Sequence, residues 1–305
     1  MESAETVAPG LLGKAAIAAG DIKLAHSVFA LPFALLAAFL AAGEPIGWRR
    51  FAGQLGLILV CMVFARTWAM LVNRLADRRL DAENPRTARR AFAAGVLSAR
   101  DGAVFLGVSG VGFCGACLLF GVLYGNWWPA GGALPVLGWI ALYSFTKRFT
   151  ALCHVFLGAA LAISPIAAAV AVDPATLGAA WAWLLAGMVL LWVAGFDVIY
   201  ALQDLDHDRG AGLHSIPSRL GAGGAIWVSR GLHLACFALL LGMWRVSGLG
   251  AIFGVAVGLT GVLLVAEHAV LARRGKAGLE MAFFTLNGVI SVTLGLAGVA
   301  DLFLG

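Results

Sequence analysis

Two short acidic segments carry the residue types that would do chemistry in this sequence. In the first, Asn73, Asp77 and Asp81 are spaced four positions apart. Four residues turn an α-helix by about 400°, so we expect these three side chains to share one face. Oxygen ligands suit Mg²⁺, which usually combines one or two carboxylates with substrate phosphates. The spacing therefore predicts metal-diphosphate binding, and a solvated helix end with local charge pairs is the alternative.

The second acidic segment begins at Asp197 and ends at Asp208. Asp204 and Asp208 repeat the four-residue spacing, and Asp197 lies two turns earlier within an apolar run. Ionisable groups inside an apolar span are costly and usually functional, and clustered acids repel each other without a cation. The predicted metal ligands are Asn73, Asp77, Asp81, Asp204 and Asp208, of which the four aspartates are the predicted catalytic residues.

Basic residues form a third group near the ends of apolar runs. Arginine can bind phosphate oxygens in a bidentate manner, and lysine contributes a point charge. Anchoring at a membrane interface is the competing explanation, and it is weaker for Arg66, which lies deepest in an apolar run. Asp197 and Tyr200 are expected to orient an acceptor. The predicted substrate-binding residues are Lys23, Arg66, Lys147, Arg148, Asp197 and Tyr200.

The composition shows which elements must position these groups. The 305 residues are 61% hydrophobic and 12% charged, whereas soluble domains are about 45–50% apolar and about 25% charged. This composition excludes a secreted disulfide scaffold, a disordered chain and a nucleic-acid binder. The short apolar stretch near the N-terminus has no clear cleavage site, so we expect no cleavable signal peptide.

Nine apolar segments are candidates for membrane helices, because a span needs about 20 predominantly apolar residues. The predicted fold class is therefore all-α, a polytopic membrane protein with nine transmembrane helices. The expected spans are 25–43, 51–72, 102–124, 131–146, 150–172, 179–202, 224–245, 248–268 and 282–304.

The placement of basic residues predicts the orientation of these spans. With the N-terminus in the cytoplasm, most of the 21 basic residues fall on the cytoplasmic side, as the positive-inside rule requires. Arg49, Arg50 and Arg245 fall on the opposite side. The polar stretches at about 73–101 and 203–223 would both be cytoplasmic. We expect an integral protein, in a bacterial inner membrane, whose N-terminus and active site face the cytoplasm.

Taken together, these motifs resemble the UbiA superfamily of intramembrane aromatic prenyltransferases, and the resemblance covers nearly the whole chain. Two Asp-rich motifs with their trailing segments carry it, together with two segments similar to the 4-hydroxybenzoate polyprenyltransferase branch. These segments are Asn73 to Asp81 with Asn84 to Arg90, Tyr200 to Asp208 with Gly212 to Gly221, His26 to Phe33, and Lys147 to Thr150.

The resemblance implies a fold and a reaction. The fold would be one membrane domain over 1–305, with nine helices around a central cavity and cytoplasmic cap loops after the second and sixth helices. Mg²⁺ held by both Asp motifs would bind the diphosphate of a polyprenyl donor. The polyprenyl group would pass to a 4-hydroxybenzoate-type aromatic acid with release of diphosphate, in ubiquinone or menaquinone biosynthesis. The implied partners are polyprenyl diphosphate, the aromatic acceptor and the lipid bilayer, without nucleic acid or an obligate protein partner.

Two positions depart from the pattern of many family members. Arg74 follows Asn73 where many members have Asp, and His214-Ser215 replaces Lys-Ser. Futalosine-route menaquinone enzymes tend to share both features, so 1,4-dihydroxy-6-naphthoate is an alternative acceptor. A cation-coupled membrane transporter is an alternative of another class. The acidic segments lie at helix ends rather than at the midplane of the membrane, which disfavours the transporter.

Overall fold

The computed structural model describes residues 10–22, 29–43 and 46–305, and the regular elements among them are all helical. The all-α prediction is therefore confirmed, and a helix corresponds to each expected span. These helices are α2 (Leu31–Ala42), α3 (Trp48–Glu83), α4 (Ala99–Tyr124), α5 (Trp128–Thr146), α6 (Cys153–Val172), α7 (Ala180–Tyr200), α9 (Ile216–Ser247), α10 (Ala251–Arg274) and α11 (Asn287–Leu304).

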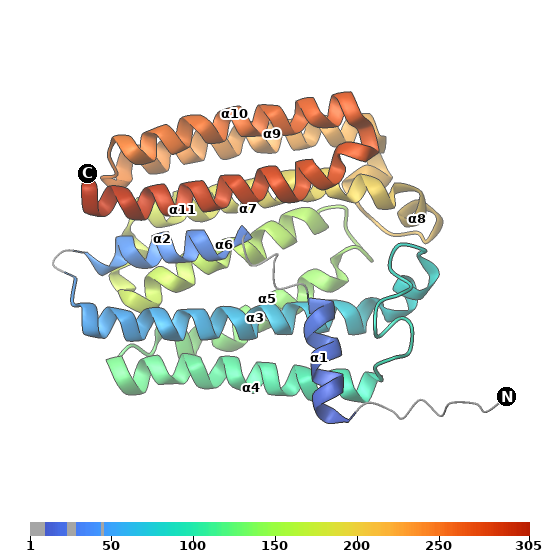
Figure 1. The fold of residues 1–305 in the computed structure, drawn as a ribbon, viewed down its shortest axis with the longest axis horizontal. Coiled ribbons are helices and arrows are strands. Elements are labelled where there is room, and N and C mark those ends of the chain that lie inside the picture. Colours follow the sequence, from blue (N-terminus) through green and yellow to red (C-terminus); the bar gives the residue numbers. More distant parts are fainter. Residues whose placement is uncertain (1–9, 23–28, 44–45) are drawn as a thin grey trace.

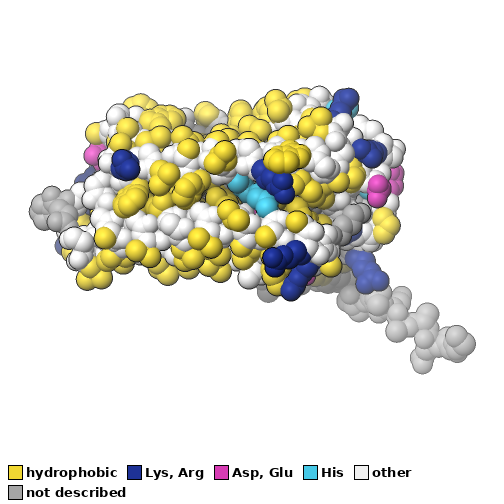
Figure 2. Space-filling model, turned by 90° about the horizontal axis from the view of Figure 1, so that it is seen from above, with side chains coloured by type: hydrophobic (Ala, Val, Ile, Leu, Met, Phe, Trp, Pro, Cys, Tyr) yellow, Lys and Arg dark blue, Asp and Glu magenta, His cyan; other side chains and the backbone are white. Residues whose placement is uncertain are grey.

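Within the described residues, seven helical segments are long and apolar enough to cross a membrane. The other two expected spans correspond to α2, a shorter apolar helix of 12 residues, and α5, whose interior contains Pro135. Hydrophobic side chains cover much of the lateral face in Figure 2, and most of its Lys and Arg side chains lie toward one end. This distribution is typical of a bundle embedded in lipid.

A helix outside the expected spans, α1 (Leu11–Ile22), lies across α3 and α4 near one end of the bundle (Figure 1). Its Ile17 and Ala18 pack against the cluster that includes Leu71 of α3. The Lys14 Nζ donates to Asp101 Oδ1 of α4 at 2.9 Å. The N-terminal apolar stretch thus forms a crossing helix, which suits its length of 12 residues.

The helices extend further into the polar stretches than the expected span boundaries. α3 continues through three further turns to Glu83, because residues 73–83 contain no Gly or Pro and Pro85 follows soon after. α9 begins at Ile216 rather than at 224, and Gly221, with φ of +70°, breaks it near its start. The extension of α3 carries the first acidic segment, and the second lies on α7 and on the short helices that follow it.

Short helices complete the connections between the long ones. The end of α7 continues into two of them, which lie at the same end of the bundle as the end of α3 (Figure 1). The short elements are η2 (Pro174–Gly178), η3 (Ala201–Asp204), α8 (Leu205–Gly210), η4 (Gly275–Gly278) and the π-helical η5 (Met281–Leu286).

α7 forms the centre of the packing. Its Trp192 is fully buried between aromatic rings that include Phe33 and Phe196. α6 approaches α7 closely at Gly158, where an added Cβ would lie 2.3 Å from the carbonyl oxygen of Leu190. Small residues at such contacts are how membrane helices pack tightly. The second acidic segment therefore begins on the most deeply buried of the described spanning helices.

Candidate active site

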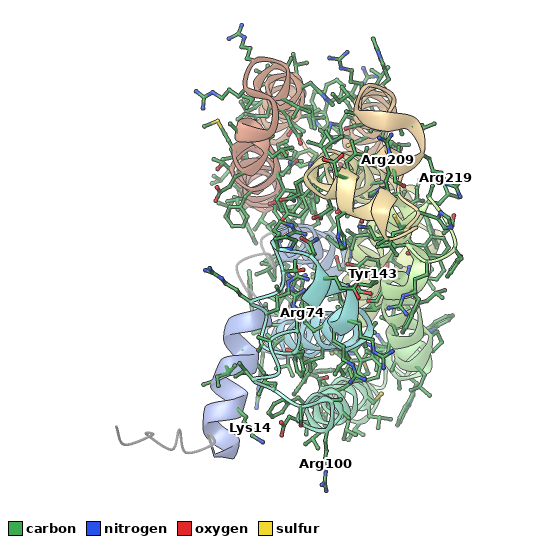
Figure 3. All side chains as sticks on the ribbon, turned by 90° about the vertical axis from the view of Figure 1, so that its right-hand side faces the viewer. Lys14, Arg74, Arg100, Tyr143, Arg209 and Arg219 are labelled. Atoms are coloured by element: carbon green, nitrogen blue, oxygen red, sulfur yellow. The ribbon has the colours of Figure 1, made fainter. Side chains whose placement is uncertain are left out.

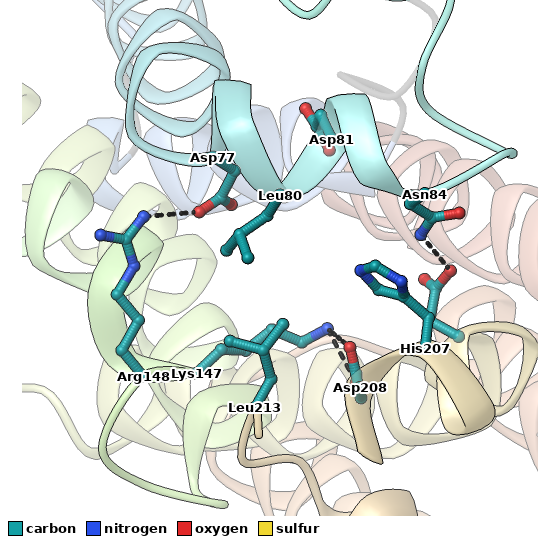
Figure 4. Close-up of a pocket in the computed structure, with 10 residues that line it drawn as sticks. Asp77, Leu80, Asp81, Asn84, Lys147, Arg148, His207, Asp208 and Leu213 are labelled. Carbon is teal, nitrogen blue, oxygen red and sulfur yellow. Dashed lines mark hydrogen bonds and ion pairs between the residues drawn. The ribbon is translucent and has the colours of Figure 1, made fainter. Parts of the chain in front are cut away.

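The two acidic segments meet at one small pocket at the capped end of the bundle (Figure 4). The pocket has a volume of about 60 Å³ and is formed by the end of α3, the turn after α5, and α8 with its flanking residues. Four predicted acids and two predicted bases line it. The lining residues are Asp77, Leu80, Asp81, Asn84, Lys147, Arg148, Asp204, His207, Asp208 and Leu213.

Two adjacent bases connect the two acidic segments across this pocket. Lys147 Nζ lies 3.1 and 3.0 Å from the two carboxylate oxygens of Asp208, and Arg148 Nη2 lies 3.0 Å from Asp77 Oδ1. Both bases follow α5, where Thr146 ends the helix and the chain turns. One turn of chain thus supplies a positive charge to each acidic segment.

The other two acids pair with arginines of the loop after α3. Arg90 Nη1 donates to Asp81 Oδ1 at 2.7 Å. Arg86 donates from Nε and Nη2 to the two oxygens of Asp204, at 2.9 and 2.7 Å, and Asn84 Nδ2 donates to Asp204 Oδ1 at 3.2 Å. Each of the four carboxylates that line the pocket is therefore paired with a cation, and two of these cations, Lys147 and Arg148, line the pocket themselves.

The pocket's acids keep two of its bases charged. Burial alone would lower the pKa of Arg86, but hydrogen bonds to Asp204 and the negative charge of that group outweigh it and raise the pKa above its usual value. The same opposition, between burial and the charge of Asp208, raises the pKa of Lys147. Both groups remain cationic at neutral pH, as recognition of an anion at this pocket requires.

Asn73 does not line this pocket. Its Nδ2 donates to Asp77 Oδ2 at 3.1 Å, and its Oδ1 accepts from Arg74 Nη1 at 3.2 Å. Arg74, the residue that departs from the family pattern, is buried. The side-chain oxygen of Asn73 is therefore engaged by Arg74 in this arrangement, and its assignment as a metal ligand stays a prediction.

A second, much larger cavity lies inside the bundle. It has a volume of about 390 Å³ and is lined almost wholly by apolar side chains of α3, α4, α5 and α6. Arg66 and Tyr143 are polar exceptions, and the buried Nε of Arg66 has no hydrogen-bond partner among the described residues. One turn of α5 separates Tyr143, at this cavity, from Lys147, at the small pocket. The two spaces therefore follow each other along α5.

The remaining predicted residues lie elsewhere. Asp197 lies deeper than the small pocket, and its Oδ2 is 2.6 Å from His154 Nδ1. The ring of Tyr200 stacks on Phe283 with centroids 4.0 Å apart, and the Arg86 guanidinium lies 6.0 Å from the same tyrosine centroid. Lys23 lies outside the described residues, so its substrate-binding role stays a prediction.

Sequence reasoning missed several residues of the site. Asn84, Arg86 and Arg90 belong to a trailing segment without a predicted role, although their proximity to Asp81 is a usable signal. Tyr143 precedes Lys147 by four residues, so helical spacing places both on one face. No such signal predicts the other residues that line the apolar cavity.

Figure 3 looks onto the capped end and shows Arg74 and Tyr143 near its centre, with Lys14, Arg100 and Arg219 at its periphery.

Comparison with known proteins identifies the family. The profile of the UbiA prenyltransferase family matches residues 30–289. The chain belongs to the UbiA prenyltransferase family. A UbiA homologue of Aeropyrum pernix K1, solved in its apo form, superimposes with a TM-score of 0.80 at 30% identity, covering 92% of this chain and 99% of that one. The UbiA-like fold predicted from the sequence is thereby confirmed, and the transporter alternative is set aside.

Relatives with a named activity match most of the chain. A 4-hydroxybenzoate octaprenyltransferase of Pseudoalteromonas atlantica is 31% identical over 80% of this chain and 83% of its own length. Its counterpart in Edwardsiella ictaluri is 32% identical over 83% of this chain and 84% of its own length. A UbiA homologue of Archaeoglobus fulgidus, solved with GPP and Mg²⁺, shares the fold with a TM-score of 0.64 at 17% identity, covering 93% of this chain and 99% of that one.

The donor set of the small pocket fits a hard cation. No group of three or more His, Cys, Asp or Glu side chains within the described ranges is arranged to hold a metal ion by itself. Carboxylates facing a pocket that also holds bases instead suit a cation whose remaining ligands are substrate phosphate oxygens, which is the usual pattern for Mg²⁺. In this UbiA prenyltransferase, Asp77, Asp81, Asp204 and Asp208 are the residues that would hold it.

Proposed function

We propose that this chain transfers a polyprenyl group from polyprenyl diphosphate to a 4-hydroxybenzoate-type aromatic acid, with release of diphosphate and with Mg²⁺ as cofactor. The observation that carries the proposal is the succession of two spaces, a small pocket lined by paired acids and bases and a large apolar cavity. The first suits a diphosphate and the second a prenyl chain. The names of the relatives in Pseudoalteromonas and Edwardsiella support the aromatic acid.

The small pocket would bind the diphosphate end of the donor. Lys147, Arg148 and Arg86 supply charged N–H donors at the pocket or its rim. These donors stabilise the negative charge that grows on the leaving diphosphate as its bond to the allylic carbon breaks. Bound Mg²⁺ would add charge neutralisation at the same oxygens. The acids hold these bases in place before the substrate arrives.

The apolar cavity would hold the prenyl chain. Its lining includes Ile58, Phe113, Phe120 and Leu161, and Tyr143 lies at the part nearest the small pocket. Burial of a prenyl chain against such side chains is favourable by about 25 cal/mol for each Å² removed from water. With the chain in the cavity and the diphosphate in the small pocket, the reacting allylic carbon lies next to the charged groups.

The acceptor would lie between the two spaces. Arg66, whose Nε has no partner among the described residues, is the candidate contact for the carboxylate of the aromatic acid. Asp197 of α7 is the candidate contact for the hydroxyl group of the aromatic acid. The electron-rich ring forms a C–C bond to the allylic carbon as the C–O bond to diphosphate breaks, and a base then accepts the ring proton and restores the aromatic ring. The cap excludes water that would otherwise react with the allylic carbon.

The distribution of basic residues indicates how the protein is oriented in the membrane. The small pocket lies at the end of the bundle where basic residues such as Arg209 and Arg219 gather (Figure 3). The positive-inside rule supports a cytoplasmic site and N-terminus in a bacterial inner membrane. We propose one membrane domain over 1–305 that needs no obligate protein partner and binds no nucleic acid.

An acceptor panel tests the proposed reaction. Purified protein is incubated with Mg²⁺, geranyl diphosphate and either 4-hydroxybenzoate or 1,4-dihydroxy-6-naphthoate, and products are identified by mass spectrometry. We expect prenylated 4-hydroxybenzoate and released diphosphate. If only the naphthoate is prenylated, the acceptor is 1,4-dihydroxy-6-naphthoate and not 4-hydroxybenzoate. If neither compound is prenylated, the proposal is refuted.

A substitution at Arg66 tests the acceptor's position. Arg66→Ala is expected to raise the KM for 4-hydroxybenzoate by about 10- to 100-fold, because a charged hydrogen bond is lost, and to leave the KM for geranyl diphosphate nearly unchanged. An increase confined to the diphosphate would instead assign Arg66 to the donor.

A further inference from the structure

Asp197 and His154 form a close pair in the interior of the bundle. His154 Nδ1 lies 2.6 Å from Asp197 Oδ2, and the pair joins α6 to α7. The histidine side chain is 1% exposed, whereas the aspartate side chain is 22% exposed. The histidine is thus enclosed behind a carboxyl group that still has an accessible surface. His154 lines neither the small pocket nor the large cavity.

The accessible surface of Asp197 does not belong to the diphosphate pocket. Asp197 is absent from the linings of both the small pocket and the large cavity, and it precedes Asp204 by seven residues, about 10 Å along a helix. Tyr143, which lines the apolar cavity, lies within electrostatic range of Asp197, Arg66 and Asp77. Asp197 therefore lies near Tyr143, the residue of α5 at which the large cavity comes closest to the small pocket.

A backbone contact fixes the tautomer of His154. The N–H of Ile216 donates to His154 Nε2 at 3.3 Å, so Nε2 is an acceptor and carries no hydrogen. Nδ1 must then carry the ring hydrogen and donate it to Asp197, because a neutral imidazole has one donor and one acceptor nitrogen. Since the second nitrogen of the ring is satisfied by the backbone, the imidazole cannot turn without losing both bonds.

The backbone group that fixes His154 belongs to the cap. Ile216 begins α9, and Ser215 before it forms a capping box with Ser218. Ser215 Oγ also donates to Asp208 Oδ2 at 2.9 Å. Two consecutive residues of the cap therefore connect to both halves of the site, Ser215 to an acid of the diphosphate pocket and Ile216 to His154.

We propose that His154 is a positioning residue for binding of the aromatic acceptor. Its imidazole holds the Asp197 carboxylate in the orientation that accepts a hydrogen bond from the acceptor's hydroxyl group. This inference rests on the proposed function. One oxygen of Asp197 is occupied by the imidazole, so the other is directed to the substrate. Recognition then requires the ring, the Nδ1 hydrogen and the cap contact together.

Two amide substitutions separate the contacts of His154. An asparagine at position 154 offers its NH₂ near the place of Nδ1, and a glutamine offers its amide near the place of Nε2. His154→Ala and His154→Gln are expected to lower kcat/KM for the aromatic acceptor by about 10- to 100-fold, with the KM for geranyl diphosphate within about twofold of wild type. His154→Asn is expected to restore most of the loss, and His154→Ala in an Asp197→Asn background should add little, as expected for a coupled pair.

Several outcomes would overturn the inference. These are rescue by His154→Gln and not by His154→Asn, a rise in the KM for the diphosphate, or an unchanged kcat/KM for the acceptor in His154→Ala. Glutamine has nearly the volume of histidine, so His154→Gln keeps the test available if the alanine variant fails to fold. Kinetics of the wild-type protein, measured in parallel, distinguish failure of the proposed function from failure of this inference. Absence of product from wild type refutes the proposed function and this inference with it, whereas normal acceptor kinetics in His154→Ala refutes this inference alone.

Discussion

The guanidinium of Arg86 binds the carboxylate of Asp204 in a bidentate manner, with Nε and Nη2 at 2.9 and 2.7 Å from its two oxygens. The two residues are 118 positions apart, and Arg86 follows the first acidic segment whereas Asp204 belongs to the second. This contact joins the loop after α3 to the short helices after α7. It holds Asp204, which lines the small pocket, in fixed relation to a base of the loop after α3.

Replacing Arg86 tests whether that geometry matters for the donor. Arg86→Lys keeps the charge and loses the planar pair of donors, so kcat/KM for geranyl diphosphate should fall by about tenfold or more. Arg89→Lys is the matched control, because Arg89 lies exposed on the same loop and its replacement should change little. Steady-state kinetics at saturating aromatic acid provide the measurement. Equal effects of the two substitutions would count against a role for the bidentate contact.

Removing single carboxylates of the small pocket should abolish Mg²⁺-dependent turnover. Asp77→Asn and Asp208→Asn each remove the charge of a predicted oxygen ligand and its ion pair with Arg148 or Lys147, and we expect activity to fall by about 100-fold or more. Asp206→Asn provides a control, because Asp206 is exposed on α8 and does not line the pocket. Product formation is measured with protein that has inserted normally into membranes. Activity that persists after chelation of Mg²⁺ would contradict the assignment of these acids.

Filling the apolar cavity should discriminate between prenyl donors by length. Gly131 and Gly132 are neighbours on α5, and an added Cβ meets nothing within 4 Å at either position, but only Gly132 lines the cavity. Gly132→Phe should raise the KM for long polyprenyl diphosphates by about tenfold, because of overpacking, with a smaller effect on geranyl diphosphate. Gly131→Phe should leave both unchanged. Competition between donors of different length, read by mass spectrometry, decides this; equal effects on both donors would mean that the chain does not occupy the cavity.

A buried polar network away from the site should contribute to stability. Asn287 donates to Glu267 Oε1 at 3.1 Å and accepts from Trp192 Nε1 at 2.6 Å. Asn287→Leu leaves both partners without that bond and should destabilise the fold by roughly 1–3 kcal/mol. Val289→Ala, at an exposed position of the same helix, is the control. Thermal unfolding in detergent should show a lower Tm only for the first variant, and an unchanged Tm would show that the network is not stabilising.

The sequence alone determined the features that depend on local geometry and composition. An apolar content of 61% places the chain in lipid, because so few charged groups cannot cover a soluble surface. The four-residue spacing of Asp77 and Asp81 places both on one face of a helix whatever the rest of the fold does. The spacing of Asp204 and Asp208 marks the second acidic segment in the same way, and both segments line one pocket.

Only the tertiary structure decided which groups face one another. In the folded protein Arg86 pairs with Asp204 and Lys147 pairs with Asp208. The side-chain oxygen of Asn73 accepts a hydrogen bond from Arg74, and His154 is enclosed behind Asp197. The physical reason is that apolar residues cover both the lipid-facing and the protein-facing sides of these helices, so hydrophobic periodicity does not specify how they pack. Partner choice across the bundle then follows from close packing at small residues, which no local pattern encodes.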